Sequence, residues 1–152
     1  MPRPGFADDK SIFLNSTTVA KIEKSRLEEI RILVLKNNKV DVRVYVFSDD
    51  NAEPLPTRKG IWLSAKDLPD IVAALEKLDS GSAAEIKLEI GQSEKIQTRV
   101  YTAEFRGRML VHIRTYYLQN NEFKPGKGVA FSAKLTKQVA DGLKSAMGQL
   151  KK

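Results

Sequence analysis

The sequence predicts an α+β fold made of two tandem copies of one strand-strand-loop-helix unit. Three observations predict it: matching residues recur about 68 positions apart, strand-like apolar runs precede a helical apolar stripe in each half, and each half carries a basic loop. Two copies are too few for a solenoid, but they suffice for a pseudo-symmetric pair. The recurring pairs are Arg31 with Arg99, Gly60 with Gly128, Ser64–Lys66 with Ser132–Lys134, Ile71 with Val139, and Leu75 with Leu143.

The first copy is expected over residues 17–79, after a flexible N-terminal tail (1–16), and the second over 85–152, after a linker (80–84). A copy of about 60 residues is marginal alone, because a small domain buries too little surface. We therefore expect the two copies to pack on each other, or the chain to form a homodimer.

The elements of the first copy follow from its apolar pattern. Ile30–Leu35 predicts a buried strand, and Asn37–Asn38 a tight turn, since asparagine tolerates positive φ. Valine alternates with polar or aromatic residues over 40–47, so its valines share one face. A long loop is expected over 49–60. The apolar stripe of 65–78 predicts a helix, and we expect this helix to cover the valine face.

The second copy repeats this plan with clearer signals. Glycine at the first turn and asparagine at the second suit tight hairpins. Its expected elements are a lead-in over 85–90, strands over 98–105 and 108–117 joined at Arg106–Gly107, a turn at Asn120–Asn121, a basic loop over 124–128, a short strand over 129–131, and a helix capped by Ser132.

Composition restricts the classes of function. The chain has no cysteine, which excludes disulfides and thiolate chemistry, and it has one histidine. No stretch approaches the roughly 20 apolar residues that span a bilayer, and residues 1–5 lack the apolar run of a signal peptide. We therefore expect no membrane association and an intracellular location: the cytoplasm or nucleoid of a prokaryote, or the nucleus of a eukaryote.

The net charge of +7 lies almost wholly in the second half of the chain. Residues 1–78 carry a net charge of +1, and residues 79–152 a net charge of +6. A polyanionic partner bound mainly by the second copy explains this asymmetry. A general solubility charge is the alternative explanation.

Strand alternation gives the second copy a cationic and aromatic open face. If Val111 and Ile113 point to the helices, the alternate residues of the same strand point away from them. Arg106 is expected at the hairpin tip, with Phe105 and Tyr117 at the strand ends beside it. Unpaired bases stack on such rings while cations hold the phosphates, without regard to sequence. The residues expected on the open face are Arg108, Leu110, His112, Arg114 and Tyr116.

Two segments of the second copy carry a family resemblance. Phe105–Tyr117 holds an aromatic residue, a basic-Gly-basic hairpin and an aliphatic-x-Ile-Arg-x-Tyr-aromatic strand, and Glu122–Val129 holds a Lys-Pro-Gly-basic-Gly loop. Together they resemble the single-stranded-DNA-binding domain of the positive cofactor four transcriptional coactivators. The resemblance covers residues 98–150 well and 22–78 more loosely.

The resemblance implies curved four-stranded antiparallel sheets, each backed by a C-terminal helix, which pair to form adjacent channels for single strands. The sequence departs from the family pattern at His112, where an acid is common, at Tyr117, where tryptophan is common, and at Ala103, where an arginine is usual. The nucleic-acid contacts that the resemblance implies are Phe105, Arg106, Arg108, Arg114, Tyr117, Lys124 and Lys127.

The first copy is expected to bind nucleic acid more weakly. It has no aromatic residue that matches Phe105, and the acids Asp49, Asp50 and Glu53 in its loop repel phosphate. We expect it to act mainly as the structural partner, with Trp62 either stacking a base or packing in the core. Its weaker candidates for nucleic-acid binding are Lys36, Lys39, Arg43, Arg58, Lys59 and Trp62.

Sequence-independent binding of single-stranded DNA, or RNA, is the function that these features predict, in an accessory factor for transcription, replication or repair. The alternative is an assembly scaffold that offers the same basic face to an acidic protein. We expect no enzyme, cofactor or metal, because His112 has no second ligand and no nucleophile–base set occurs. The acids of residues 49–53 are taken as a solvated turn.

Overall fold

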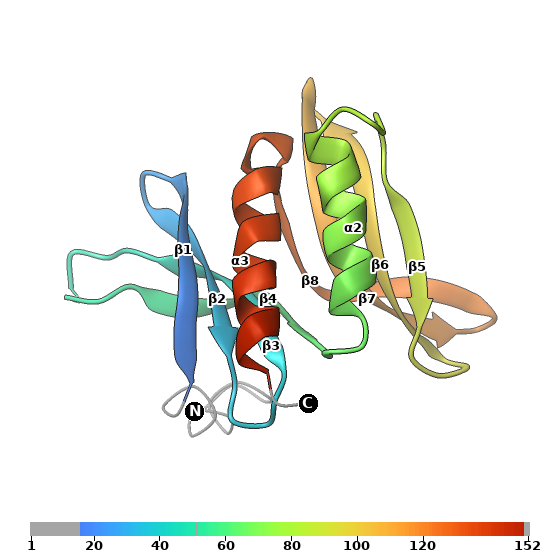
Figure 1. Ribbon diagram of the computed structural model, residues 1–152, viewed down its shortest axis with the longest axis horizontal. Helices are drawn as coiled ribbons and strands as arrows, with labels where there is room; N and C mark the ends of the chain where they lie inside the picture. The colour runs from blue at the N-terminus through green and yellow to red at the C-terminus, as the bar shows by residue number, and fades with distance from the viewer. Residues whose placement is uncertain (1–15, 51, 151–152) are drawn as a thin grey trace.

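Two four-stranded antiparallel sheets, each followed by a helix, confirm the α+β class (Figure 1). The computed structural model describes residues 16–50 and 52–150, so nearly all of the predicted tail lies outside the described residues. Strands follow one another in chain order within each sheet. Sheet A contains β1 (Thr17–Ser25), β2 (Glu28–Val34), β3 (Val40–Val46) and β4 (Leu55–Leu63), and is followed by α2 (Leu68–Asp79). Sheet B contains β5 (Lys87–Gly91), β6 (Ile96–Phe105), β7 (Arg108–Gln119) and β8 (Glu122–Ser132), and is followed by α3 (Thr136–Gln149).

The tight turns between strands lie where the sequence predicts them. Asn38 has a φ of 64°, and Arg106 and Gly107 have φ values of 52° and 76°. Asn120 and Asn121 have φ values of 51° and 65°. Positive φ at both central residues gives the twist that matches paired strands, which explains why these two-residue turns fix the β6–β7 and β7–β8 registers.

The predicted loops at 49–60 and 124–128 are wrong in part, because much of each segment is strand. β4 begins at Leu55, and β8 runs through Lys124–Gly128. Each of these strands carries one irregularity in its pairing with the preceding strand, between Arg43 and Tyr45 in sheet A and between Arg114 and Tyr116 in sheet B. A β-bulge accommodates proline and glycine within a ladder, so these residues do not end the strand here.

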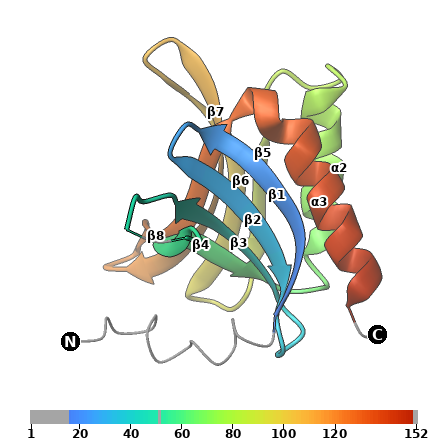
Figure 2. The ribbon, with the colours of Figure 1, turned by 90° about the vertical axis from the view of Figure 1, so that its left-hand side faces the viewer.

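The helices exchange sheets, which corrects the expectation that residues 65–78 cover the valine face. α3 contacts β1 and β2 of sheet A, and a Cβ atom on Gly142 would lie 2.6 Å from Ile32 Cδ1 and 2.9 Å from Ala20 Cβ. α2 lies over sheet B and packs beside α3 (Figure 1). Figure 2 shows both helices on one side of the strands. Each sheet is thus backed by the helix that follows the other sheet.

The start of α2 is fixed to sheet B rather than to its own sheet. Asp67 occupies the N-cap position, so the helix begins at Leu68, three residues later than predicted. Its carboxylate accepts hydrogen bonds from Ser64 Oγ at 2.9 Å and from Gln92 Nε2 at 2.8 Å. Gln92 immediately follows β5, and its bond therefore holds the helix start at the edge of sheet B.

One continuous core joins the two sheets and both helices. Val40, Val42 and Val44 of β3 are fully buried in the same cluster as Val111 and Ile113 of β7. α2 contributes Ile71 and Leu75, and α3 contributes other apolar side chains. β4 lies against β8 where the sheets meet. Within residues 16–50 and 52–150, no helix is long and apolar enough to cross a membrane.

Candidate nucleic-acid interface

The face of sheet B that points away from the helices carries the candidate site. Val111 and Ile113 are fully buried in the core, as predicted, so the alternate residues of β7 lie on the other face. Arg108 and Tyr116 lie eight residues apart on this strand, a span of about 26 Å at 3.3 Å per residue. We call this surface the open face of sheet B. It contains Gln97, Arg99, Tyr101, Ala103 and Phe105 of β6, paired with Tyr116, Arg114, His112, Leu110 and Arg108 of β7.

Arg99 lies between two aromatic rings at the centre of the open face. Its guanidinium carbon is 4.3 Å from the ring centroid of Tyr116 and 5.3 Å from that of Phe123. Its Nε donates a hydrogen bond of 2.9 Å to Gln97 Oε1. The side chain of Arg99 retains 24% exposure. A cation held this way is fixed in place and still partly open to a phosphate.

A row of three aromatic rings runs beside Arg99. The rings of Tyr101 and His112 stack with centroids 4.9 Å apart and planes 2° from parallel. The hydroxyl groups of Tyr101 and Tyr116 lie 2.7 Å apart in a hydrogen bond. Burial, and then the charge of Arg114, lower the pKa of His112, so this imidazole is neutral at pH 7. The open face is therefore aromatic as well as cationic at its centre.

The Tyr116 phenol is expected to resist ionisation. Burial and the hydrogen bond with Tyr101 raise its pKa from 10.0 to about 12. Because the folded protein holds this proton more tightly than the unfolded chain, stability contributed by the neutral phenol should decline as the pH rises from 10 to 12. Burial also raises the pKa of Tyr45, so ultraviolet titration should show late ionisation from both tyrosines. The Tyr116 part of the late absorbance change should move to lower pH in Tyr101→Phe and disappear in Tyr116→Phe. A late absorbance change of undiminished size in Tyr116→Phe would contradict this assignment.

Arg114 lies over a glycine that leaves space for it. Gly128 pairs with Arg114 across β7 and β8, and a Cβ atom on Gly128 would lie 2.7 Å from Arg114 Cβ. Arg114 Nη1 donates a hydrogen bond of 2.9 Å to the Gly126 carbonyl oxygen. The bulge in β8 thus orients one edge of the guanidinium, and Arg114 stays partly exposed.

The β6–β7 hairpin forms one end of the candidate site. The Phe105 side chain is 56% exposed, and the Arg106 guanidinium carbon lies 5.1 Å from its ring centroid. Arg108 pairs with Phe105 across the hairpin and is also exposed. Two cations therefore flank one exposed ring, the arrangement that the sequence predicts at this tip.

Tyr117 lies at the other end of β7, which corrects the expectation that it lies beside Arg106. It pairs with Ile96 and Lys124, about 30 Å along the strand from Arg108. By alternation Tyr117 projects from the face opposite that of Arg114 and Tyr116. Its side chain is 42% exposed. Lys124 and Lys127 are exposed nearby, and Lys124 Nζ is 2.7 Å from Glu122 Oε2.

The corresponding face of sheet A is closed. Arg43 is only 7% exposed and forms an ion pair of 2.9 Å with Asp41, which is fully buried. Arg43 Nη1 also donates a hydrogen bond of 2.8 Å to the Thr57 carbonyl oxygen. Burial raises the pKa of Asp41, and the charge and hydrogen bonds of Arg43 oppose that shift. Arg43, a weaker candidate from the sequence, is therefore not displayed to solvent.

The other candidates in sheet A are scattered. Trp62 packs on a small apolar cluster of Leu33, Leu35 and Tyr45, the packing alternative left open by the sequence. Lys36 and Lys39 are exposed at the β2–β3 turn. Arg58 and Lys59 are exposed on β4, beside the bulge. No exposed ring stands beside these lysines and arginines in the described part of sheet A, apart from Phe47 at its far end.

Sequence reasoning missed Arg99 and Tyr101 as site residues. The recurrence of Arg31 as Arg99 in the second copy is the sequence feature that could have identified Arg99. The two arginines have similar surroundings in the structure. Arg31 also lies over a tyrosine ring, 4.7 Å from the centroid of Tyr45, and its Nε bonds Glu29. Within the described residues, no group of three or more histidine and carboxylate side chains is placed to hold a metal ion.

Comparison with known proteins finds similarity to one family in the part of the chain that contains sheet B. Residues 92–141 match the family model of transcriptional coactivator p15 (PC4). No curated protein sequence matches the chain significantly. Among solved structures, a PC4 homologue from Burkholderia pseudomallei is 25% identical, with 41% of this chain and 86% of that chain covered and a TM-score of 0.39. The bacteriophage T5 homologue of PC4, implicated in recombination-dependent DNA replication, is 27% identical over 44% of this chain and 81% of its own, with a TM-score of 0.40.

The family match spans the part of the chain that builds the open face, from the turn before β6 to the first turns of α3. The match agrees with the resemblance seen in β7 and β8: residues 92–141 are similar to the transcriptional coactivator p15 (PC4) family.

Proposed function

We propose that the open face of sheet B binds single-stranded DNA without sequence preference. The observation that carries this proposal is the length and chemistry of the surface. The exposed ring of Phe105 lies at the hairpin end of the open face, and Arg99 and Arg114 lie along it. The exposed ring of Tyr117 lies at the far end of β7, on the other side of that strand, where a bound strand would pass the edge of the sheet. Unpaired bases stack on exposed rings, whereas bases in a duplex are already stacked on one another.

The proposal includes one bound strand per chain. Sheet A pairs with sheet B around a single core, so the chain supplies within itself the partner that two separate domains supply to each other in the resembling family. The buried Asp41–Arg43 pair and the packed Trp62 leave the face of sheet A without a cation between exposed rings. We infer that sheet A serves as the structural partner in such a pseudo-symmetric pair.

Fluorescence anisotropy with a labelled oligonucleotide tests the proposal. Single-stranded DNA should bind more tightly than the duplex of the same sequence, with little difference between mixed sequences. Log affinity should fall with log salt at a slope of about −0.7 for each phosphate contact. An RNA oligonucleotide distinguishes DNA preference from general single-strand binding. Equal affinity for duplex and single strand would contradict the proposal, and absence of nucleic-acid binding would favour the scaffold alternative.

Arg114→Ala and Tyr117→Ala should weaken binding of single strands. Loss of a stacked ring costs about 1–3 kcal/mol per base, or about 5- to 160-fold in affinity. Arg114→Ala should also reduce the salt slope by about 0.7. Arg58→Ala, which removes an exposed cation from sheet A, is the matched control and should change affinity little. The same anisotropy titration measures all three variants, and equal losses would show that both sheets bind alike.

The biological role that we propose is an accessory function in transcription, replication or repair. Coating an exposed strand requires no catalysis, and indifference to sequence suits a protein that acts wherever strands separate. The T5 homologue's link to DNA replication is one precedent for such a role. Pull-down experiments with the bound strand present would identify the proteins of transcription, replication or repair that associate with this chain.

A further inference from the structure

The exposed apolar side chains of the described residues form two groups. Cations surround one group, and acids surround the other. Phe105 and Tyr117 are flanked by cations of sheet B. The second group, at the outer end of sheet A, is flanked by acids. It contains Leu27 at 60% exposure, Phe47 at 43% and Leu55 at 48%.

The second group is one contiguous patch. The Phe47 backbone N–H donates a hydrogen bond of 2.9 Å to the Leu27 carbonyl oxygen, and Leu55 pairs with Val46, the residue before Phe47. The segments that carry the patch, residues 23–29 and 47–55, contain six acids and two bases in a chain whose net charge is +7. An apolar patch with acids around it is unusual on such a basic protein, and it indicates an interaction surface.

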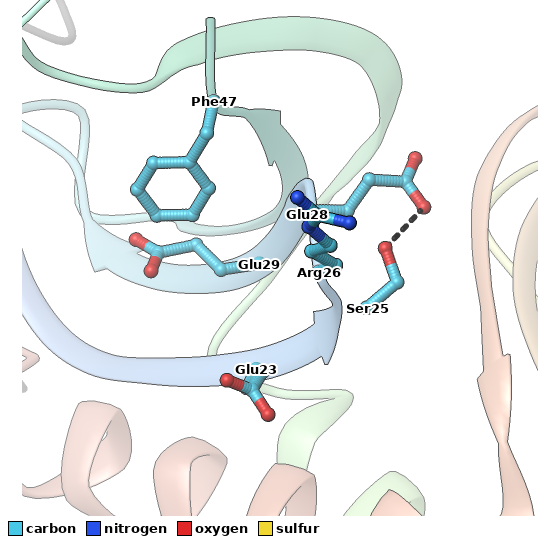
Figure 3. Close-up of a pocket in the computed structure, with 6 residues that line it drawn as sticks. All are labelled: Glu23, Ser25, Arg26, Glu28, Glu29 and Phe47. Atoms are coloured by element: carbon cyan, nitrogen blue, oxygen red, sulfur yellow. Dashed lines mark hydrogen bonds between the residues drawn. The ribbon is translucent and has the colours of Figure 1, made fainter.

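A shallow hollow of about 250 Å³ opens beside Phe47. Its lining comes from β1, the β1–β2 turn, β2 and the end of β3. Figure 3 shows Phe47 next to Glu29 on one side of β1, and the side chain of Glu23, a residue of β1, on the other side of that strand. Glu28 accepts a hydrogen bond of 3.4 Å from Ser25 Oγ and forms an ion pair of 3.3 Å with Lys24, and Glu29 forms an ion pair with Arg31. Arg26 is the one cation of the lining. The excess negative charge therefore comes from Glu23 and from the acids of residues 49–53 beside the hollow. We call this hollow, with Leu27 and Leu55, the acidic socket.

The β6–β7 hairpin has the complementary shape and charge. It projects beyond the body of sheet B (Figure 2). Phe105, the more exposed of the two exposed rings of sheet B, lies at its end with Arg106 and Arg108 beside it. No acid lies between Phe105 and Arg108, and Glu104 precedes them.

We propose that the acidic socket binds the β6–β7 hairpin of a second copy of this chain. Phe105 contacts the apolar side chains of the socket, and Arg106 and Arg108 face its carboxylates. The socket is at the outer end of sheet A and the hairpin is on sheet B, so each copy offers one of each. Such a head-to-tail contact leaves one free socket and one free hairpin in each pair, so further copies can add to form chains or rings.

This association and nucleic-acid binding use the same hairpin, so they exclude each other. The competition rests on the proposed function, whereas the self-association does not. Copies without nucleic acid associate through the hairpin, and a single strand releases them by covering Phe105 and the two arginines. Salt weakens both interactions, since both depend on exposed charges.

Sedimentation of the full chain without nucleic acid tests the self-association. Mass should increase with protein concentration at low salt and decrease when an unlabelled single-stranded oligonucleotide is added. A socket variant, Leu27→Ser with Phe47→Ser, should weaken association about tenfold or more while its affinity for single strands is unchanged. A hairpin variant, Phe105→Ser with Arg108→Glu, should weaken both. Tyr117→Ser is the converse control: it should weaken DNA binding and leave association unchanged.

A mixture of the socket and hairpin variants gives the sharpest outcome. At a protein concentration where each variant alone is monomeric, the mixture retains one intact socket and one intact hairpin and should form 1:1 dimers and nothing larger. Circular dichroism establishes that both variants are folded. The proposal is overturned if the parent chain is a monomer at every concentration. It is also overturned if the socket variant and the hairpin variant each associate as strongly as the parent chain. Failure of DNA binding with association intact would instead overturn the proposed function alone.

Discussion

Arg43→Ala is expected to lower the free energy of unfolding by about 3–5 kcal/mol, because it breaks a buried ion pair. Asp41 is fully buried, and Arg43 supplies its neutralising charge through an ion pair of 2.9 Å and hydrogen bonds from Nε of 3.2 Å. Without Arg43 the carboxylate stays buried and uncompensated. Urea denaturation of the variant and the parent chain measures the loss.

The pH dependence of the variant separates this explanation from a loss of packing. Burial already raises the pKa of Asp41, and removing Arg43 removes the main opposing charge, so the pKa should rise further. A carboxyl with a raised folded pKa binds a proton more tightly when folded, so stability increases as the pH falls through that range. The difference in free energy of unfolding between the parent chain and Arg43→Ala should therefore become smaller at acid pH.

A matched control replaces both members of the pair. Asp41→Asn with Arg43→Met removes the uncompensated charge and should recover much of the stability lost in Arg43→Ala. A loss below about 1 kcal/mol in Arg43→Ala, the range of exposed pairs, would show that Asp41 reaches water in solution. Single-strand affinity, measured well below the melting temperature, should change little, because Arg43 is not displayed on the surface.

A fragment of residues 85–152 is expected not to fold as a monomer. It contains sheet B and α3, but the helix that covers sheet B in the full chain is α2. The core face of sheet B, including Val111 and Ile113, would be left open, at a cost of about 25 cal/mol per Å² of apolar surface. The fragment should instead form a dimer in which each α3 covers the other copy's sheet.

Size-exclusion chromatography with light scattering and thermal melting checks this expectation. The fragment should have twice its monomer mass, and its melting temperature should rise with concentration. Co-expression with residues 16–84 should compete with dimer formation and give a complex of the two halves. A folded, concentration-independent monomer would contradict the helix exchange.

Local signals in the sequence predicted much of the fold correctly. The asparagine and glycine turns, the buried faces of β3 and β7, and the order of strands and helices all follow from residues within one element or its neighbour. The exchange of α2 and α3 does not, because their apolar stripes fit either sheet equally well. Proline and glycine in β4 and β8 suggested loops, since the pattern does not show that a bulge keeps these residues in the ladder.

The candidate site was predictable where it depends on alternation along one strand. Arg114 and Tyr116 lie on the open face of β7 as their spacing indicates. Arg99 was missed because its role comes from two rings on other strands, Tyr116 and Phe123. Arg43 was wrongly expected to be available for binding. Asp41 lies two residues before it on the same face of β3, and the ion pair between them keeps Arg43 away from solvent.

Helix exchange also bears on synthesis of the chain at the ribosome. Ile32 of β2 packs against Gly142 of α3. Sheet A is synthesised first, but its apolar face is covered only after nearly the whole chain has left the ribosome. Such long-range closure slows folding and leaves valine-rich strands open to wrong partners in the interval. Nascent chains halted before α3 should therefore be recognised by chaperones that bind exposed apolar strands.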